Sequence, residues 1–175
     1  MNRNKITSYI YAKDNNKPHL MKDVFTKFAK LDIKLNSNNI SFPSETIGLE
    51  EITTVLVNDF NKTYENVYTL CLEDTFEEKE NTIQCKWFVI MTDKTTKEIR
   101  VGYGLYLWHF NNKHLVNKLN ITIEKMIILE TMYNNEIFNW IKQLPYPWCD
   151  NKIAYKNMPT INELSSLFDM IKNNS

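Results

Sequence analysis

The stretch Glu98–Phe110 constrains the fold more than any other part of this sequence. It is rich in β-branched and aromatic residues, which predicts one long strand. It also holds Gly102 and Gly104, two of the three glycines in the chain. Residues two apart share one face of a strand, so we expect both glycines on the same face as Tyr106 and Trp108.

The opposite face of this strand is apolar as well, because it carries Val101, Tyr103, Leu105 and Leu107. A strand that is apolar on both faces is covered on both sides. Paired glycines let a sheet bend or let another group approach its backbone closely. The stretch therefore predicts the middle strand of a strongly curved sheet with helices in its hollow.

Composition limits the class of protein. The chain has 175 residues, 43% of them hydrophobic, which is enough to bury a sizeable core. Lys and Arg balance Asp and Glu at 21 each, and this argues against a nucleic-acid binder that works by bulk charge. No apolar run reaches the roughly 18 residues of a membrane span. The N-terminus lacks the apolar core of a signal peptide, so we expect a cytoplasmic protein.

The cysteines and histidines do not predict a metal or redox site. Cys71, Cys85 and Cys149 show no CxxC spacing, and we expect them to be reduced and buried. The three histidines lack zinc-like spacing, and there is no glycine-rich phosphate loop. We therefore expect neither a metal nor a cofactor.

Hydrophobic periodicity predicts an order of helices and strands. A first helix at 3–13 is followed by a second helix that starts at Pro18 and carries Phe25 and Phe28 on its apolar stripe. A third helix is expected from Thr46. Period-two alternation and polar turns then predict an antiparallel meander. The predicted short strands are 32–35 and 39–42, and the predicted long strands are 66–72, 82–92, 98–110 and 115–129.

This order predicts an α+β fold in which a strongly curved antiparallel sheet wraps around the N-terminal helices. We expect one domain over 1–175, with a core at about 18–130 and a helical C-terminal extension at about 131–175. Leu144–Cys149 interrupts the extension because it contains two prolines. It is either a lid over a pocket mouth or a packed, extended connection.

The predicted order resembles the nuclear transport factor 2-like superfamily, with its SnoaL-like and ketosteroid-isomerase-like members. The resemblance rests on the element order, on Gly48-Leu-Glu-Glu-Ile52 opening the third helix, and on the Val101–Phe110 strand. It implies a conical pocket between the sheet and the helices. It also implies a homodimer that buries the outer face of the sheet, although the C-terminal helices are an alternative cover.

The resemblance gives two positions for catalytic groups. Isomerase-like members place an acid–base carboxylate where this chain has Phe42, and a protonated acid where it has Tyr106. The matched base is therefore absent, while Tyr106 can still donate a hydrogen bond. Asp32 is the nearest candidate base, and it would need a pKa raised by burial to act near neutral pH. Glu124 is expected to point away from the face of Tyr106, unless the register slips by one residue.

Three functions remain open from the sequence. The first is binding of a small apolar or aromatic molecule, the second is a SnoaL-like lyase or isomerase, and the third is a homodimeric interaction module with a filled cone. The aromatic residues either line a pocket or simply fill the core. The expected ligand-binding residues are Phe25, Phe28, Trp87, Tyr106, Trp108 and Phe110.

Overall fold

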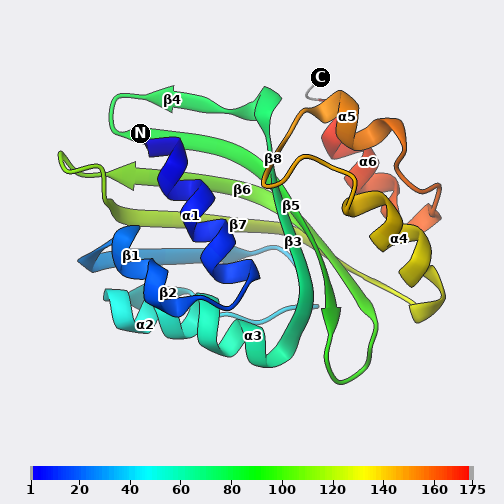
Figure 1. Cartoon of the computed structure of the whole chain (residues 1–175), viewed down its shortest axis with the longest axis horizontal. Helices are drawn as coiled ribbons and strands as arrows, with labels where there is room; N and C mark the ends of the chain where they lie inside the picture. The colour runs from blue at the N-terminus through cyan, green and yellow to red at the C-terminus, as the bar shows by residue number, and fades with distance from the viewer. Residues whose placement is uncertain (1, 174–175) are drawn as a thin grey trace.

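A large, strongly curved sheet forms the centre of the computed structural model, which describes residues 2–173 (Figure 1). Within these residues eight strands make one open sheet, ordered β2-β1-β7-β6-β5-β3-β8, with β4 attached to β5. The strands are β1 (Phe25–Leu35), β2 (Glu45–Ile47), β3 (Tyr64–Leu72), β4 (Glu77–Lys79), β5 (Thr82–Asp93), β6 (Ile99–Phe110), β7 (Val116–Leu129) and β8 (Trp148–Cys149).

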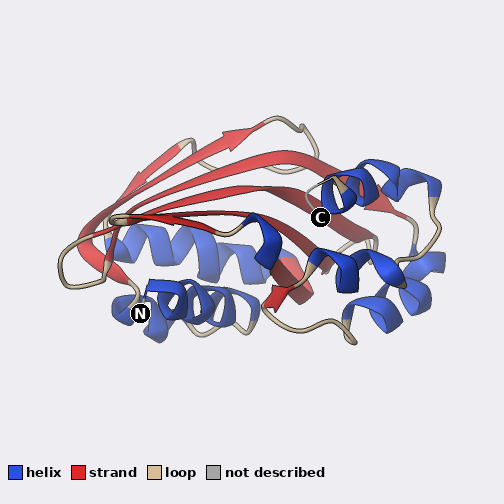
Figure 2. Cartoon of the chain, turned by 90° about the horizontal axis from the view of Figure 1, so that it is seen from above, coloured by secondary structure: helices blue, strands red, loops and turns tan. Residues whose placement is uncertain are grey.

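Helices cover the hollow of the sheet at one end and its outer face at the other (Figure 2). The N-terminal helix α1 (Asn2–Asp14) lies in the hollow beside a continuous helical segment made of α2 (Leu49–Thr53), a π-helical turn (Thr54–Asp59) and α3 (Phe60–Thr63). Against the outer face pack α4 (Asn134–Ile141), α5 (Asn151–Lys156) and α6 (Ser165–Lys172). Short 3₁₀ turns lie at Pro18–Asp23, Glu73–Thr75, Thr131–Tyr133 and Asn162–Leu164.

The predicted meander is confirmed, because β3 pairs antiparallel with β5, β5 with β6, and β6 with β7. The outer pairs, β1 with β7 and β3 with β8, are parallel, which the prediction of an antiparallel sheet did not include. The predicted face of β6 is confirmed as well. Tyr106 and Trp108 are buried in the core on the α1 side, whereas Ile99 and Val101 are buried in the core on the side of the extension. Successive side chains of a strand point to opposite faces, so the face of one residue determines the face of all the others in β6.

The predicted second helix is wrong beyond its first turn. The chain leaves the 3₁₀ turn after Asp23 and enters β1, which runs parallel to β7. The pattern of Leu20, Met21, Val24 and Phe25 reflects a short turn followed by a strand rather than one amphipathic helix. The strand predicted at 39–42 is also absent, and the strand that follows β1 is β2.

A β-bulge in β7 lies opposite Gly104. The pairing of β6 with β7 shifts between Tyr103 and Gly104, so that Glu124 is left between the partners of these two residues. A Cβ atom on Gly104 would collide with the backbone carbonyl of Thr122, so the strands approach too closely for any side chain here. The glycine thus allows the close approach that the sequence predicted.

Part of the outer face is covered by the C-terminal extension. Ile99 and Val101 pack with residues of α4 and α6, while Leu105 and Leu107 remain half-buried. This is the alternative cover that the sequence left open. The homodimer therefore stays a prediction, and the surface left for it is smaller than the sequence implied.

Candidate ligand-binding cavity

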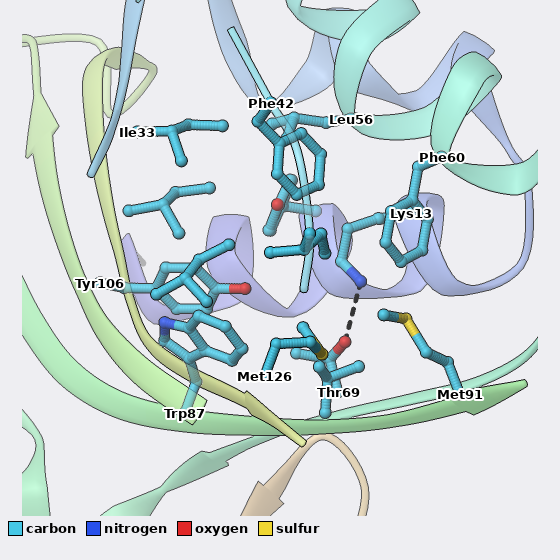
Figure 3. Close-up of a pocket in the computed structure, with 15 residues that line it drawn as sticks. Lys13, Ile33, Phe42, Leu56, Phe60, Thr69, Trp87, Met91, Tyr106 and Met126 are labelled. Carbon is cyan, nitrogen blue, oxygen red and sulfur yellow. Dashed lines mark hydrogen bonds between the residues drawn. The ribbon is translucent and has the colours of Figure 1, made fainter. Parts of the chain in front are cut away.

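A small cavity lies between the hollow of the sheet, α1 and the helical segment 49–63 (Figure 3). Its volume is about 40 Å³, which is room for about two or three water molecules. Its walls are mostly aliphatic, aromatic and thioether groups. The sheet supplies Ile33, Thr69, Trp87, Val89, Met91, Tyr106, Ile121, Ile123 and Met126, and the helices with the loop before β2 supply Tyr9, Lys13, Ile40, Phe42, Leu56 and Phe60.

The one charged side chain in this lining is Lys13, from the last turn of α1. Its side chain is only 7% exposed, and its Nζ atom lies 4.5 Å from the centre of the Phe60 ring. Nζ donates to Asp14 Oδ1 at 2.6 Å and to Thr69 Oγ1 at 2.8 Å. An ammonium group has three N–H donors, so the third has no hydrogen-bond acceptor here and meets either the face of Phe60 or a group in the cavity.

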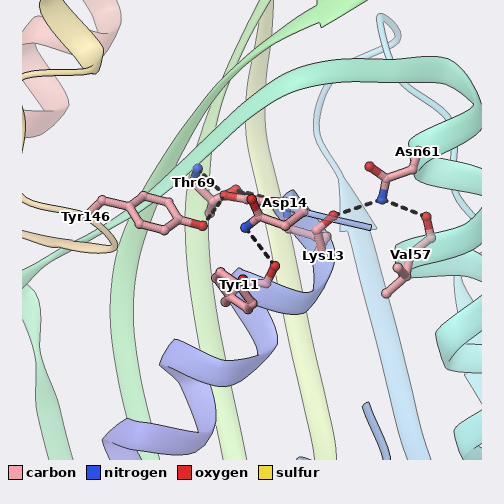
Figure 4. A network of polar contacts seen from close by, with 8 residues as sticks. Tyr11, Lys13, Asp14, Val57, Asn61, Thr69 and Tyr146 are labelled. Atoms are coloured by element: carbon pink, nitrogen blue, oxygen red, sulfur yellow. Dashed lines mark hydrogen bonds and ion pairs between the residues drawn. The ribbon is translucent and has the colours of Figure 1, made fainter. Parts of the chain in front are cut away.

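Asp14 lies behind Lys13 and outside the cavity lining (Figure 4). Its carboxylate also accepts hydrogen bonds from Thr69 N at 2.7 Å, Thr69 Oγ1 at 2.9 Å and the Tyr146 hydroxyl at 2.9 Å. Asn61 donates to the Lys13 carbonyl at 2.8 Å and so attaches the end of α1 to the helical segment. These contacts hold a buried ion pair in a fixed place, with its positive end toward the cavity.

Tyr9 and Tyr106 contribute the phenol groups of the cavity. Burial raises the pKa of Tyr106 well above its ordinary value, with a smaller effect from Tyr9. Burial also raises the pKa of Tyr9, followed by the nearby charge of Asp14, and a side-chain hydrogen bond with Tyr106 opposes this rise. Both phenols are therefore neutral hydrogen-bonding groups at physiological pH. Trp87 stacks on Tyr106, with ring centres 5.1 Å apart.

The aromatic residues that the sequence grouped into a pocket are separated by the structure. Trp87 and Tyr106 line the cavity. Phe25, Trp108 and Phe110 are buried in the core next to it, outside the lining. The expectation for Phe28 is wrong: its side chain is 78% exposed, because residue 28 belongs to a strand and not to an inward-facing helix.

Asp32 points out of the cone, which contradicts its suggested role as a base in the pocket. It follows Leu31 and precedes Ile33, both buried on the hollow side, so its side chain lies on the outer face. There it pairs with Lys118 at 3.1 Å and Lys30 at 3.4 Å. Partial burial raises its pKa, but these two ammonium groups outweigh that effect and lower it overall. A base for neutral pH would need the opposite shift.

The structure also shows where Glu124 lies, and where Phe42 lies, the residue at the position of the isomerase carboxylate. Glu124 is exposed at the bulge of β7 and accepts a hydrogen bond from Asn36 at 2.8 Å. Phe42 lines the cavity, so an apolar ring stands where the resemblance would put a carboxylate. Among the residues that the structure describes, no Asp or Glu lines the cavity, and no three His, Cys, Asp or Glu residues are grouped to hold a metal ion.

Leu144–Cys149 is a packed connection rather than a lid. Its end forms β8, which pairs with the β3 edge at Cys71 and Leu72. Trp148 donates to Thr7 on α1 at 2.9 Å, and the Arg3 guanidinium lies 4.3 Å from the centre of its ring. None of these residues lines the cavity.

Sequence reasoning missed Lys13, Asp14 and Thr69. A lysine in the last turn of a helix is ordinarily explained by the helix dipole and by solvent. The single available signal was the Lys13-Asp14 pair directly after the apolar residues Ile6, Tyr9 and Ile10, which places it at the inner end of the buried helix.

Comparison of structures identifies the fold. A nuclear transport factor 2-like protein from Burkholderia pseudomallei matches with a TM-score of 0.58 at 10% identity, over 77% of this chain and 95% of the other. A ketosteroid isomerase-like protein from Catenulispora acidiphila, in complex with trimethylamine, gives 0.55 at 11% identity over 67% and 82%. A computationally designed 17-OHP binder gives 0.53 at 13% identity over 67% and 88%.

This chain has the nuclear transport factor 2-like fold, as the resemblance implied. No family model matches its sequence, and the comparison with curated proteins finds no match. Across the described residues, no helix combines the length and apolar character needed to cross a membrane.

Proposed function

We propose that this protein binds a small, mostly apolar molecule that carries one hydrogen-bond acceptor, in the cavity beside Lys13. The observation that carries the proposal is the buried Lys13 ammonium, which faces apolar walls and retains one N–H donor. A buried donor without a partner is costly, and an acceptor on the ligand would supply that partner.

The volume of the cavity and the charge of Lys13 restrict the size and the chemical class of the expected ligand. A dry cavity of about 150 Å³ binds benzene in a well-studied case, so the walls of a cavity of about 40 Å³ must move to admit an organic ligand, and they must move least for a small, slender one. The Catenulispora acidiphila protein of the same fold is in complex with trimethylamine, which supports a very small molecule as ligand. An amine here would meet the charge of Lys13, so we propose a ketone, aldehyde or similar acceptor instead.

A lyase or isomerase that uses a carboxylate base has less support. Such a base must reach the substrate, and the acidic residues considered from the sequence lie outside the cavity. The filled-cone interaction module also has less support, because the cavity retains space next to a charged group.

Methionine methyl NMR tests the proposal with 2-butanone as the probe. Met91 and Met126 line the cavity and should shift on titration, whereas the exposed Met132 should not. The double variant Lys13→Met/Asp14→Asn removes the donor without leaving an unpaired buried charge, and should weaken binding about tenfold. Lys17→Met, at an exposed position, is the matched control. Unchanged binding in the double variant, or no shift of Met91 and Met126 in the unmodified protein, would contradict the proposal.

A further inference from the structure

We propose that the cavity is the inner half of a longer site, whose outer half is a surface groove on the far side of Phe42 and Phe60. The complete site would take an unbranched molecule with an acceptor at its head and an apolar chain behind it. This inference rests on the proposed function and names the class of ligand more closely.

The two phenyl rings border both spaces. Phe42 and Phe60 line the inner cavity, and they also line a groove of about 360 Å³. The other walls of this groove are formed by Ser41, Pro43, Val55, Asp59, Thr63 and Tyr64. The rings therefore lie at the boundary between the smaller cavity and the larger groove.

Side chains of the helical segment 49–63 line both the cavity and the groove. Leu56 and Phe60, four residues apart, face the cavity, while Val55 and Asp59 face the groove. The segment changes from α to π geometry at Thr54–Asp59, directly before Phe60. Turns of π-helix occur frequently at functional sites, and this one sets which side chains face each space.

Phe42 lies on a segment that can let its ring move. It belongs to the stretch between β1 and β2, which has no regular secondary structure around residue 42, and its ring is only partly buried. The stretch is attached on both sides of the ring: Asn39 donates to the Met126 carbonyl at 2.8 Å, and Ser44 accepts from Ile33 N at 2.9 Å. A change in the side-chain torsions of Phe42 would join the spaces without moving these anchors.

The charges of the groove restrict the far end of the ligand. Asp59 borders the groove and forms an ion pair with Lys62 at 2.8 Å. Ser41, Thr63 and Tyr64 add hydroxyl groups. A neutral end fits these walls, whereas a carboxylate at that end would meet Asp59.

A series of 2-ketones tests the inference through the methyl signals of Met91 and Met126. Each methylene that becomes buried should strengthen binding by up to about fourfold, so 2-nonanone should bind at least tenfold more tightly than 2-butanone. Ser41→Trp places a large ring in the groove from an exposed position, and should remove this gain while leaving 2-butanone unaffected. Thr63→Trp, at another exposed position in the groove, should do the same. Ser44→Trp, exposed but outside the groove, should keep the gain.

Two results would overturn the inference and leave the proposed function standing. One is an affinity that falls with chain length beyond 2-butanone. The other is a length-dependent gain that survives in Ser41→Trp and Thr63→Trp. A lack of binding by every ketone, 2-butanone included, would instead refute the proposed function together with this inference.

Discussion

Tyr146 donates a hydrogen bond to Asp14 over 2.9 Å, and this contact ties the C-terminal extension to the last turn of α1. Burial, together with the charge of Asp14, raises the pKa of the Tyr146 phenol, so the hydroxyl stays a donor over the physiological range. The extension thereby supports the carboxylate that holds Lys13 at the cavity.

Removing the Tyr146 hydroxyl should lower the stability of the folded protein modestly. Tyr146→Phe should lower the free energy of unfolding by about 1 kcal/mol, because the bond goes to a charged group but the ring is 40% exposed and water can replace the hydroxyl. Urea denaturation measures the change. Tyr11→Phe, at a neighbouring exposed tyrosine, is the control and should have almost no effect. Equal effects of the two variants would show that the contact contributes nothing specific.

Asp93 should make stability depend on pH at the hairpin between β5 and β6. The backbone N–H of Thr96, followed by that of Thr95 and by Arg100, holds its pKa below the ordinary value of 3.8. A lowered folded-state pKa adds stability above the unfolded-state pKa, and that stability is lost as the pH falls through the folded value. Asp93→Asn should therefore cost about 1.5 kcal/mol at pH 7, and in urea titrations this cost should shrink progressively as the pH falls below 3.8. A cost that does not change with pH would contradict this.

The sheet could be predicted from the sequence because its signals are local. Strands β3, β5, β6 and β7 were predicted from a period of two and from the polar turns and loops between them, and the face of Tyr106 follows from parity alone. Only the end of the first strand was predicted, at 32–35, and residues 25–31 were not. Residues 25–35 become β1 by pairing with β7, more than 80 positions away, and nothing in their own pattern shows that partner.

The candidate site was predicted only in part, for a related reason. Trp87 and Tyr106 were found because strand parity places them in the hollow. Lys13 was missed because its burial depends on Phe60 and Thr69, which come from distant parts of the chain. Asp32 was placed wrongly because the predicted strand boundary did not settle which face its side chain takes.

Gly104 and Gly102 should differ in their tolerance of a methyl group. In Gly104→Ala the new Cβ meets the Thr122 backbone carbonyl, which cannot move without breaking the bulge. In Gly102→Ala it meets mainly the flexible end of Met126, which can rotate away. We expect Gly104→Ala to cost more than about 3 kcal/mol and Gly102→Ala about 1–2 kcal/mol by urea denaturation. The reverse order would show that the bulge is not held by close approach.

The three cysteines should react slowly in the native protein. Cys71, Cys85 and Cys149 are free and fully buried. Burial raises the pKa of Cys149 to about 12, and burial followed by the adjacent Cys85 raises the pKa of Cys71 well above its ordinary value. Thiol titration at pH 8 should therefore be slow without denaturant and complete in guanidinium, because only the thiolate reacts. Rapid reaction of any thiol in the native state would contradict the burial.

Substitutions of Trp108 and Tyr106 should distinguish a residue that packs the core from one that contributes to ligand binding. Trp108 is fully buried, and its ring centre lies 5.1 Å from that of Tyr9, so Trp108→Ala should cost about 3–5 kcal/mol. Tyr106→Phe keeps the ring stacked on Trp87 and removes one hydroxyl at the cavity, so it should cost only about 0.5–1.5 kcal/mol. Thermal melts with and without 2-butanone measure both effects. If Tyr106→Phe melts as low as Trp108→Ala and the ketone leaves the unmodified protein unchanged, the hydroxyl is a structural group in a filled cone. The interaction module would then replace ligand binding as the favoured function.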